Sequence, residues 1–518
     1  SECSLYLYIA TVRSHKINLT KSREYKREAS HLQRSRTTTT RTSIINIMMM
    51  LNIVHDGARS AIRRLSISSG LSSQLHDGFT NPIDFTTTTS NAMIPTTTIL
   101  VFLGAVIIVS VILSLIRTSL QTSKDKRPPV APFGMFECIR YMTSEEQPWF
   151  ALKAKEKLKG NPDTFILPLP RRPMVTGDAT LAREILTDPL SIKPKTYQEF
   201  EPFGVGSIFT RNGKYWHARR KGTAPAFSNR HVQRMNQVAL ERTEKWIEEK
   251  LIPWTESGQA FDVAEEMISI TLEAICKTAF EYDISEEEKQ NFLSNSELVF
   301  KEFLTKSINN PLRKYIGRWI PDRRKALQAA GANVLFAKKI IAKYRSNPNP
   351  LEGTIIDYLS KNPCYANDDE LAADVLLYLV AGHDTTAFTM AFTLLELARH
   401  PEEQNKVRND ISNMTTADEW RKSDALKRAI KESMRLYPVS ASGSSRVCGR
   451  EFTTKEGWTV PKGTVVVSHI MMTHRNKNVY GNDADSFIPS RWENPTQAQK
   501  DSFLIFSAGK QNCVGQSL

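Results

Sequence analysis

Cys513 is the residue of this chain with the clearest capacity for chemistry. It stands in the stretch 506–515, FSAGKQNCVG, after a loop that contains Gly509 and before a small-residue segment that predicts a helix. A lone cysteine is most often an inert buried residue. At the start of a helix, however, the dipole and the unpaired backbone N–H groups favour the thiolate. Gly509 and Gly515 would also let a flat ring approach the backbone, so Cys513 is a candidate metal ligand.

A group of small polar residues interrupts a long helical pattern further back in the chain. The pattern runs from Asp369 to Pro401 and is apolar nearly all round in its middle third, which predicts a buried central helix. Residues 381–386, AGHDTT, are poor choices for a helix interior. We expect the Thr385 hydroxyl to compete for the carbonyl of Ala381 and to open a groove for a small ligand or waters. A simple packing kink is the alternative.

Two charged groups are spaced for an ion pair. Glu432 and Arg435 lie three residues apart, which places a carboxylate and a guanidinium on one helix face. Such pairs are usually solvated and weak, although the apolar neighbours of this pair indicate partial burial. Arg491 follows in the aromatic, proline-containing stretch 487–492, which by itself predicts a well-packed turn.

The composition indicates a large globular protein with reduced thiols. The chain has 518 residues, of which 40% are hydrophobic and 24% charged, enough for a sizeable core. The six cysteines form no CxxC pair, so a disulfide framework or a structural zinc site is not expected. The net charge of +14 fits nucleic acid, an anionic membrane or an acidic partner. Nucleic acid is the weakest of these, because the sequence carries no nucleic-acid-binding motif.

The first part of the chain differs from the rest. Residues 1–92 are poor in acids and rich in Ser, Thr and Arg, which predicts a disordered or targeting-like extension. The alternative is that this stretch is the conceptual translation of an untranslated region of the transcript. Residues 93–118 contain the uncharged run 99–116, ILVFLGAVIIVSVILSLI, long enough at ~27 Å to cross a bilayer as a helix. Basic residues follow this run, so the positive-inside rule places the remainder in the cytosol.

The remainder divides into a hinge and a catalytic domain. Residues 119–134 are basic and include Pro128, Pro129 and Pro132, which predicts a stiff extended hinge. Residues 135–360 are mostly helical in pattern, with short strand-like pieces such as 165–167. After Glu451 the pattern changes to strand-like alternation, with the run 464–468. The predicted fold class is therefore mainly α with a smaller β part.

These motifs, in this order, resemble those of the cytochrome P450 family. Its haem loop, FxxGxxxCxG, is matched by Phe506, Gly509, Cys513 and Gly515. Its ExxR pair is matched by Glu432 and Arg435, with Arg491 placed to complete that network. Its oxygen-binding helix motif is matched by Ala381, Gly382, Asp384 and Thr385. Its WxxxR helix is matched by Trp216 and Arg220, and Arg446 falls where a further propionate-binding residue is common. The resemblance covers roughly residues 135–518.

The resemblance implies a function and a set of roles. Cys513 would be the axial ligand of haem b iron, and Asp384 and Thr385 would supply protons during oxygen activation. The propionate charges would be offset by Trp216, Arg220 and Arg446. The implied reaction inserts one oxygen atom of O2 into a small apolar substrate, with lipid-like molecules preferred. A structural role on the proximal side falls to Glu432, Arg435 and Arg491.

The resemblance also implies partners and a location. Electrons would come from NADPH through NADPH–cytochrome P450 reductase, with cytochrome b5 as a second candidate donor. Docking candidates on the basic helix around Trp216 are Lys214, Arg219 and Lys221. The chain would be anchored in the lipid bilayer of the endoplasmic reticulum with its catalytic domain in the cytosol, a mitochondrial or plastid membrane being the alternative.

Two departures from the family pattern keep other functions open. Gln511 stands where the family usually has Arg or His, so a propionate would meet an uncharged amide unless Lys510 reaches it. The chain ends at Leu518, so we expect the catalytic domain to be incomplete at its C-terminus. One alternative is a haem-thiolate isomerase or lyase, against which the Asp384–Thr385 pair argues. The other is a catalytically inactive haem-binding fragment.

Overall fold

A single long helix, α16 (Asp368–Arg399), is the element around which the helical part is built. The computed structural model describes residues 126–142, 144, 147–204, 206–307, 313 and 317–517. Within these ranges α16 has 32 residues and is therefore ~48 Å long. The Asn367 side chain caps its first turn by accepting from the backbone N–H of Glu370. The predicted central helix is confirmed.

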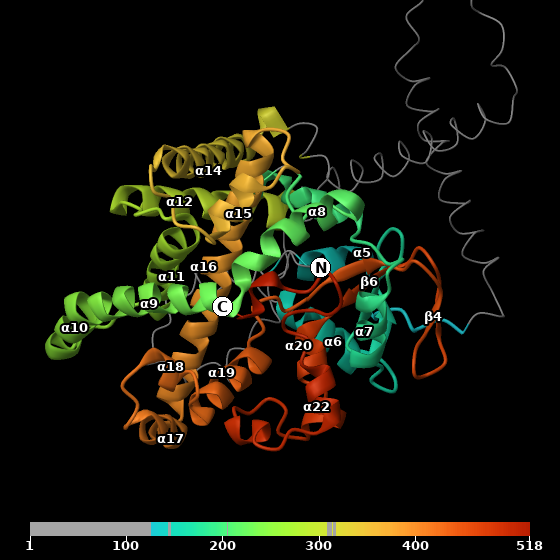
Figure 1. Cartoon of the computed structure of the whole chain (residues 1–518). Coiled ribbons are helices and arrows are strands. Elements are labelled where there is room, and N and C mark those ends of the chain that lie inside the picture. The colour runs from blue at the N-terminus through green and yellow to red at the C-terminus, as the bar shows by residue number, and fades with distance from the viewer. Residues whose placement is uncertain are drawn as a thin grey trace, which may run out of the picture. The chain divides into compact units, whose positions relative to one another are not determined.

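The other described helices precede α16 in the sequence or follow it (Figure 1). Those before it are α5 (Met135–Met142), α6 (Phe150–Lys157), α7 (Ala179–Thr187), α8 (Gly213–Thr223), α9 (Asn229–Trp246), α10 (Ile252–Ser257), α11 (Val263–Phe280), α12 (Glu286–Phe300), α14 (Pro321–Ser346) and α15 (Ile355–Lys361). Those after it are α17 (Pro401–Ile411), α18 (Ala417–Trp420), α19 (Asp424–Leu436), α20 (Ile470–His474), α21 (Lys477–Tyr480) and α22 (Gln497–Ser502).

Short 3₁₀ and π segments connect these helices. The 3₁₀ segments are η1 (Gln147–Trp149), η2 (Lys195–Phe203), η3 (Ala224–Phe227), η6 (Gly317–Trp319), η7 (Pro489–Trp492) and η8 (Val514–Ser517). The π segments are η4 (Ile247–Leu251) and η5 (Lys301–Ser307). The largest apolar cluster joins α11, α12, α14, α15 and α16 through side chains such as Leu272, Phe292, Ile340 and Leu376. Burying these faces against one another stabilises the helical part.

Two small sheets make up the β part. The first has the order β1 (Thr164–Ile166), β2 (Met174–Thr176), β6 (Val465–Ser468), β3 (Ser445–Val447). Strands β2 and β6 are parallel, with Val175 opposite Val467, whereas the two outer pairs are antiparallel. The second sheet pairs β4 (Phe452–Thr453) with β5 (Thr459–Val460). The strands expected near 165–167 and 464–468 are thus present, and the fold class is mainly α with a smaller β part, as predicted.

Part of the predicted hinge belongs to the folded domain. The backbone N–H of Ala131 donates to Ile166 O at 2.8 Å, and Ile166 N–H donates to Pro129 O at 2.8 Å. Phe133 is buried in a cluster with Phe150. Residues 126–134 therefore lie on the sheet instead of forming a free spacer. The predicted extension 1–92 and membrane anchor 93–118, and residues 119–125 of the hinge, fall outside the described residues.

The long helix is also the one described helix that is apolar and long enough to span a bilayer. Its sequence satisfies that test over an 18-residue window, but 61% of the window is buried inside the protein. The side chains of α16 pack against α11 and α14, so the helix is accounted for as the core of a folded domain.

The Glu432–Arg435 pair is fully buried, not a solvated surface bridge. Both side chains are 0% exposed, and the two guanidinium–carboxylate contacts, Nε–Oε2 and Nη2–Oε1, are each 2.8 Å. Arg491 Nε donates to Glu432 Oε1 at 3.2 Å, and the Trp492 indole N–H donates to Oε2 at 2.9 Å. The expected three-residue network is confirmed, and it joins α19 to η7.

The same network reaches the segment that leads to Cys513. Arg435 Nη1 donates to the carbonyl of His474 at 2.8 Å. The His474 Nε2 atom accepts from the backbone N–H of Leu504 at 3.2 Å, so Nδ1 carries the ring proton and faces Arg435 O at 3.3 Å. Burial lowers the pKa of His474 to about 3, which keeps the ring neutral. Leu504 lies two residues before Phe506, so the ion pair helps to position the cysteine loop.

We predict that Arg435→Met lowers the free energy of unfolding by about 3–5 kcal/mol, because it leaves a buried carboxylate without its main partner. Lys406→Met is the matched control. Lys406 pairs with Glu403 at the same spacing and a similar distance, 2.7 Å, but its side chain is 62% exposed. The control should cost less than about 1 kcal/mol. Urea denaturation followed by circular dichroism measures both, and equal losses would contradict the burial argument.

Candidate active site

The loop before Cys513 is closed by its own backbone. The N–H of Cys513 donates to the carbonyl of Phe506 at 2.9 Å, and the N–H of Asn512 donates to Gly509 O at 3.2 Å. Ser507 and Gly509 adopt positive φ angles of 63° and 74°, which make the tight turn possible. The 3₁₀ helix η8 begins at the next residue, so the predicted helical segment after Cys513 is present as a 3₁₀ turn.

Cys513 is the exposed member of the described cysteines. Burial by the surrounding protein still raises the pKa of its thiol, while the backbone N–H of Gly515 and the Arg220 guanidinium act in the opposite direction. Cys138 and Cys448 are buried, and burial raises the pKa of each to about 12. Among the described cysteines, Cys513 therefore combines solvent access with groups that stabilise a thiolate.

A metal at Cys513 would have at most two His, Cys, Asp or Glu ligands in the described part of the chain. No group of three or more His, Cys, Asp or Glu residues there could hold a metal ion. The remaining coordination positions would have to come from a group that is not protein. A flat tetrapyrrole that leaves one axial position to the protein satisfies this requirement.

Gly509 is required by the protein itself. A β-carbon at this position would lie 2.6 Å from the carbonyl oxygen of Leu186, at the end of α7. The positive φ of 74° adds a second reason, because side chains rarely adopt it. The expectation that Gly509 admits a flat ring is therefore not needed to explain this glycine. The close approach of α7 explains it.

Helix α8 brings two predicted residues to the cysteine loop. Trp216 is 9% exposed, and Arg220 is half-buried one turn further along. Arg220 Nη1 donates to the carbonyl of Asn512 at 3.0 Å, and Nη2 donates to the Asn512 side-chain oxygen at 2.9 Å. Burial lowers the pKa of Arg220, and its charge interacts with Cys513. The predicted neighbours Arg220 and Cys513 are thus brought together.

Arg219, next in the sequence, is internal, so its expected role in docking a partner protein is wrong. It is 3% exposed and contacts Glu370 at 2.9 Å and Asp374 at 3.6 Å. Asp374 is itself buried, which raises its pKa to about 6 in spite of the nearby guanidinium. The pair joins α8 to the first turns of α16. Lys214 and Lys221 are exposed and keep the position expected for a docking surface.

Arg446 is a buried cation without a carboxylate partner in the described ranges. It lies on β3, is 3% exposed, and donates one hydrogen bond, from Nη1 to Ser445 O at 2.9 Å. A buried charge that is not paired is costly. An anionic group bound nearby would remove this cost, and a haem carries two carboxylates. The residues present therefore fit a haem.

The middle of α16 differs from the expectation in one respect. The Thr385 hydroxyl donates to Ala381 O at 2.7 Å, as predicted. The helix nevertheless continues without interruption from Asp368 to Arg399, so the predicted opening is wrong; the hydroxyl shares the carbonyl with the backbone. Ala381 is exposed although it lies midway along a buried helix. Asp384 is 1% exposed, with Oδ1 3.3 Å from Nε2 of His383.

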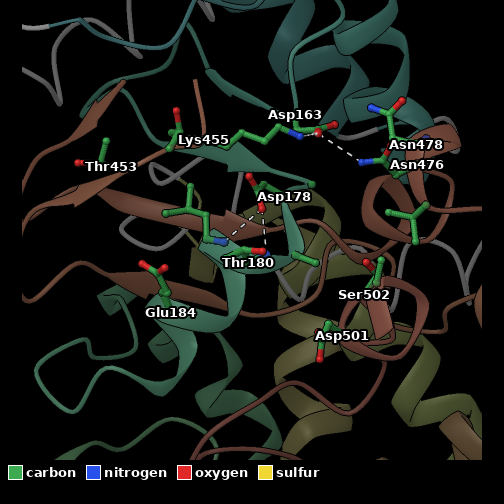
Figure 2. A pocket seen from close by; sticks show the side chains of 16 residues that line it. Asp163, Asp178, Thr180, Glu184, Thr453, Lys455, Asn476, Asn478, Asp501 and Ser502 are labelled. Atoms are coloured by element: carbon green, nitrogen blue, oxygen red, sulfur yellow. Dashed lines mark hydrogen bonds and ion pairs between the residues drawn. The ribbon is translucent and has the colours of Figure 1, made fainter. Parts of the chain in front are cut away.

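A separate polar recess lies away from these residues. It has a volume of about 590 Å³ between the start of α7, the β4–β5 hairpin, α21 and α22. Figure 2 shows the carboxylates of Asp163, Asp178 and Glu184 around it. Asp178 caps α7, and Asp163 bonds Lys155, Lys455 and Asn476. Asp163 and Asp178 thus have structural partners, and none of the predicted site residues lines the recess.

Three residues near the site were missed in the sequence. Asn512 belongs to the cysteine stretch but fills a variable position of the motif, so its contact with Arg220 gave no signal. Tyr378, seven residues before Thr385, is buried and interacts electrostatically with Arg220 and Cys513. A seven-residue spacing on one helix face could have indicated it. His383 adjoins Asp384 but fills a variable position of the motif, so the motif gave no signal for it.

Comparison with known proteins identifies the family. The family model described as Cytochrome P450 matches residues 157–518. The chain belongs to the cytochrome P450 family. As a cytochrome P450 it is a haem-dependent monooxygenase, an oxidoreductase. The cysteine loop, the α8 residues and the buried ion pair described above all lie within the matched range.

Individual cytochromes P450 resemble the chain over about two thirds of its length. "Probable cytochrome P450 4p3" of Drosophila melanogaster is 27% identical over 383 residues, covering 65% of this chain and 71% of that protein. "Leukotriene-B4 omega-hydroxylase 3" of Mus musculus is 25% identical and covers 73% of this chain and 78% of the relative. "Bifunctional cytochrome P450/NADPH--P450 reductase 2" of Bacillus subtilis (strain 168) is 26% identical over 62% of this chain and 31% of its own length.

A solved structure supports the fold. The crystal structure of a cytochrome P450 (CYP102L1) superposes with a TM-score of 0.60 and covers 71% of this chain and 88% of that one. The sequence identity is 20%, so this similarity concerns the cytochrome P450 fold alone.

We predict that Gly509→Ala destabilises the protein more than Gly457→Ala does. Both glycines have a similar positive φ, 74° and 76°, and both variants carry that strain. The added methyl group meets Leu186 O in the first variant and nothing within 4 Å in the second. The difference in the free energy of unfolding should be about 1–3 kcal/mol, the usual cost of overpacking. Equal losses of unfolding free energy for the two variants in denaturant titrations would show that α7 moves away from the added methyl group without a measurable energetic cost.

Proposed function

We propose that Cys513 would supply the thiolate ligand of a haem b and that the chain would use it to oxygenate a lipid-like substrate. The observation that carries the proposal is the exposed Cys513 thiol beside the Arg220 guanidinium, on a loop fixed from both α7 and α8. When bound, the haem supplies O–O bond cleavage, which a thiolate ligand favours by pushing electron density to the iron.

The residues that would hold the cofactor come from α8, β3, α16 and the cysteine loop. We assign the propionate carboxylates to Arg220, Arg446 and the indole N–H of Trp216, because charge-assisted bonds offset the cost of burying carboxylates. Arg446 supports this assignment as a buried cation without a carboxylate among the described residues. The turn that presents the thiolate is shaped by Phe506, Gly509 and Gly515. Ala381, exposed in the middle of α16, is assigned to the same cofactor site, where its small side chain would leave room.

Proton supply is assigned to Asp384 and Thr385. The Thr385 hydroxyl is half-buried and donates to Ala381 O, so its oxygen is free to accept a hydrogen bond from a water. Asp384 is buried one residue earlier and adjoins His383, which gives the carboxyl a neighbour that can hold a proton. We propose that protons pass from Asp384 through water to Thr385 Oγ1.

The substrate is proposed to be apolar and lipid-like. The support is the mouse relative, whose name describes a leukotriene-B4 omega-hydroxylase and which covers 73% of this chain. Leukotriene B4 is a long apolar chain with a carboxylate. Oxygen insertion into such a molecule would be tested with a panel of fatty acids, sterols and xenobiotics, of which the fatty acids should give the fastest turnover.

The electron donor is proposed to be NADPH, acting through NADPH–cytochrome P450 reductase, with cytochrome b5 as a second donor. The Bacillus relative carries a reductase in the same polypeptide, as its name states. The exposed Lys214 and Lys221 on α8 would meet acidic groups of the reductase. Turnover of hydroperoxides without NADPH would instead favour a haem-thiolate isomerase or lyase.

A membrane location is proposed from the sequence. The uncharged run 99–116 has the length and composition of a bilayer-spanning helix, and basic residues follow it. We propose anchoring in the endoplasmic reticulum with the catalytic domain in the cytosol. Fluorescent fusions with and without residues 93–118 would test this, and the mitochondrial and plastid membranes are the outcomes that would replace it.

We predict that Cys513→Ala abolishes the red-shifted Soret band of the reduced carbon monoxide complex, because no other described cysteine is positioned to replace the ligand. Cys364→Ala is the matched control, since Cys364 is the other described cysteine that is not buried. The control should keep the band. Loss of the band in both variants, or in neither, would contradict the assignment of Cys513.

We predict that Thr385→Val uncouples the reaction, so that NADPH consumption yields several-fold more peroxide and water per product, because the variant removes the hydroxyl of the proposed proton path. Thr386→Val is the control. Thr386 makes an equivalent hydrogen bond, to Gly382 O at 2.9 Å, but points about 100° further round the helix. Product and peroxide are quantified together, and equal uncoupling in both variants would contradict the role of Thr385.

A further inference from the structure

Asn512 holds the guanidinium of Arg220 with two uncharged acceptors. One is its backbone carbonyl, 3.0 Å from Nη1, and the other is its side-chain oxygen, 2.9 Å from Nη2. The two residues are 292 positions apart in the sequence. This fork therefore ties α8 to the residue immediately before Cys513.

The fork uses part of the hydrogen-bonding capacity of Arg220 and none of its charge. A guanidinium has five N–H donors, so three stay available once Asn512 has taken two. In the described part of the chain, the hydrogen bonds of Arg220 go to neutral acceptors and no carboxylate pairs with it. An anion beside this half-buried guanidinium would offset the cost of removing its charge from water. Its five donors are pre-oriented for a carboxylate, which a guanidinium binds in a planar fork.

We propose that Asn512 is a positioning residue that orients Arg220 toward a haem propionate while leaving its positive charge to that carboxylate. The inference rests on the proposed binding of haem by Cys513 and Arg220. An amide meets both needs, because it accepts a hydrogen bond and carries no charge. A carboxylate of the same shape would bind Arg220 more strongly and neutralise it.

The Asn512→Asp variant separates this role from a purely structural one. If Asn512 only clamps two elements together, the new ion pair strengthens the clamp, and the haem stays bound as long as in the wild type or longer. If Asn512 preserves the charge of Arg220, the variant loses haem faster, by about tenfold for one weakened charge-assisted bond. The measurement is the rate of haem transfer from the full-length holoprotein to excess apomyoglobin.

The reduction potential gives a second readout, which reports whether the introduced carboxylate is charged in the holoprotein. A carboxylate beside the ligand loop stabilises the ferric over the ferrous state, so Asn512→Asp should shift the potential to more negative values. Gln516→Glu is the matched control, since it adds the same charge at an exposed position three residues after Cys513. The control should change neither the transfer rate nor the potential by more than a small fraction of the Asn512→Asp effect.

Haem dimethyl ester tests the link to the propionates directly. Its carboxylates are masked, so the difference in retention between the wild type and Asn512→Asp should largely vanish with this cofactor. Asn512→Leu serves if the aspartate variant does not fold: it should release haem faster than the wild type but release the diester at a similar rate. Equal acceleration for both cofactors would overturn the proposal in favour of a structural role.

The failure of this inference can be told from a failure of the proposed function. A wild-type protein without the thiolate carbon monoxide band overturns the haem-thiolate assignment, and this inference with it. A wild type that shows the band, together with an Asn512→Asp variant that retains haem equally well, overturns the role of Asn512 alone.

Discussion

The structure depends on one buried pair of charges. Glu432 and Arg435 are both fully enclosed, and the guanidinium donates to backbone carbonyls of segments that follow much later in the chain, at His474, Ala484 and Ser486. A buried guanidinium must satisfy its donors, so these irregular segments have to converge on it. Neutral His474 accepts a hydrogen bond from the backbone N–H of Leu504 and thereby fixes the start of the cysteine loop. The loop that carries the Cys513 thiol is in this way connected by hydrogen bonds to the rigid helix α19.

Charge around Cys513 is arranged differently. Arg220 and Arg446 are cations that the described protein does not neutralise, one half-buried and one almost fully buried. Arg219, beside Arg220 in the sequence, is paired with two carboxylates inside the protein. Adjacent residues of one helix thus serve opposite purposes. Arg219 secures α8 to α16 through two carboxylates, whereas Arg220 has no carboxylate partner among the described residues.

Periodicity and motif spacing predicted the long helix, the short strands and the residues around Cys513, because these depend on local patterns. Burial could not be predicted in the same way. The i,i+3 spacing of Glu432 and Arg435 is shared by Glu403 and Lys406, whose lysine is exposed, and tertiary packing decides which pair is enclosed. The assignment of Arg219 to the surface failed for the same reason. Gly509 was noticed, but the carbonyl of Leu186 that requires a glycine there lies 323 residues earlier and leaves no mark in the local sequence.

The segment before α5, the first helix of the described residues, covers one edge of the sheet. Strands β1 and β3 are the outer strands, and each is covered by a short stretch of chain: Val130 bridges to Ile166, and Ile192 bridges to Val447. Open strand edges recruit other chains into intermolecular β-pairing, which leads to aggregation. Pro128 and Pro129 strengthen the barrier, because proline has no N–H to donate to an incoming strand. A truncated variant that begins at Met135 would therefore expose the edge of β1 and promote self-association, even though it keeps every residue of the proposed catalytic centre.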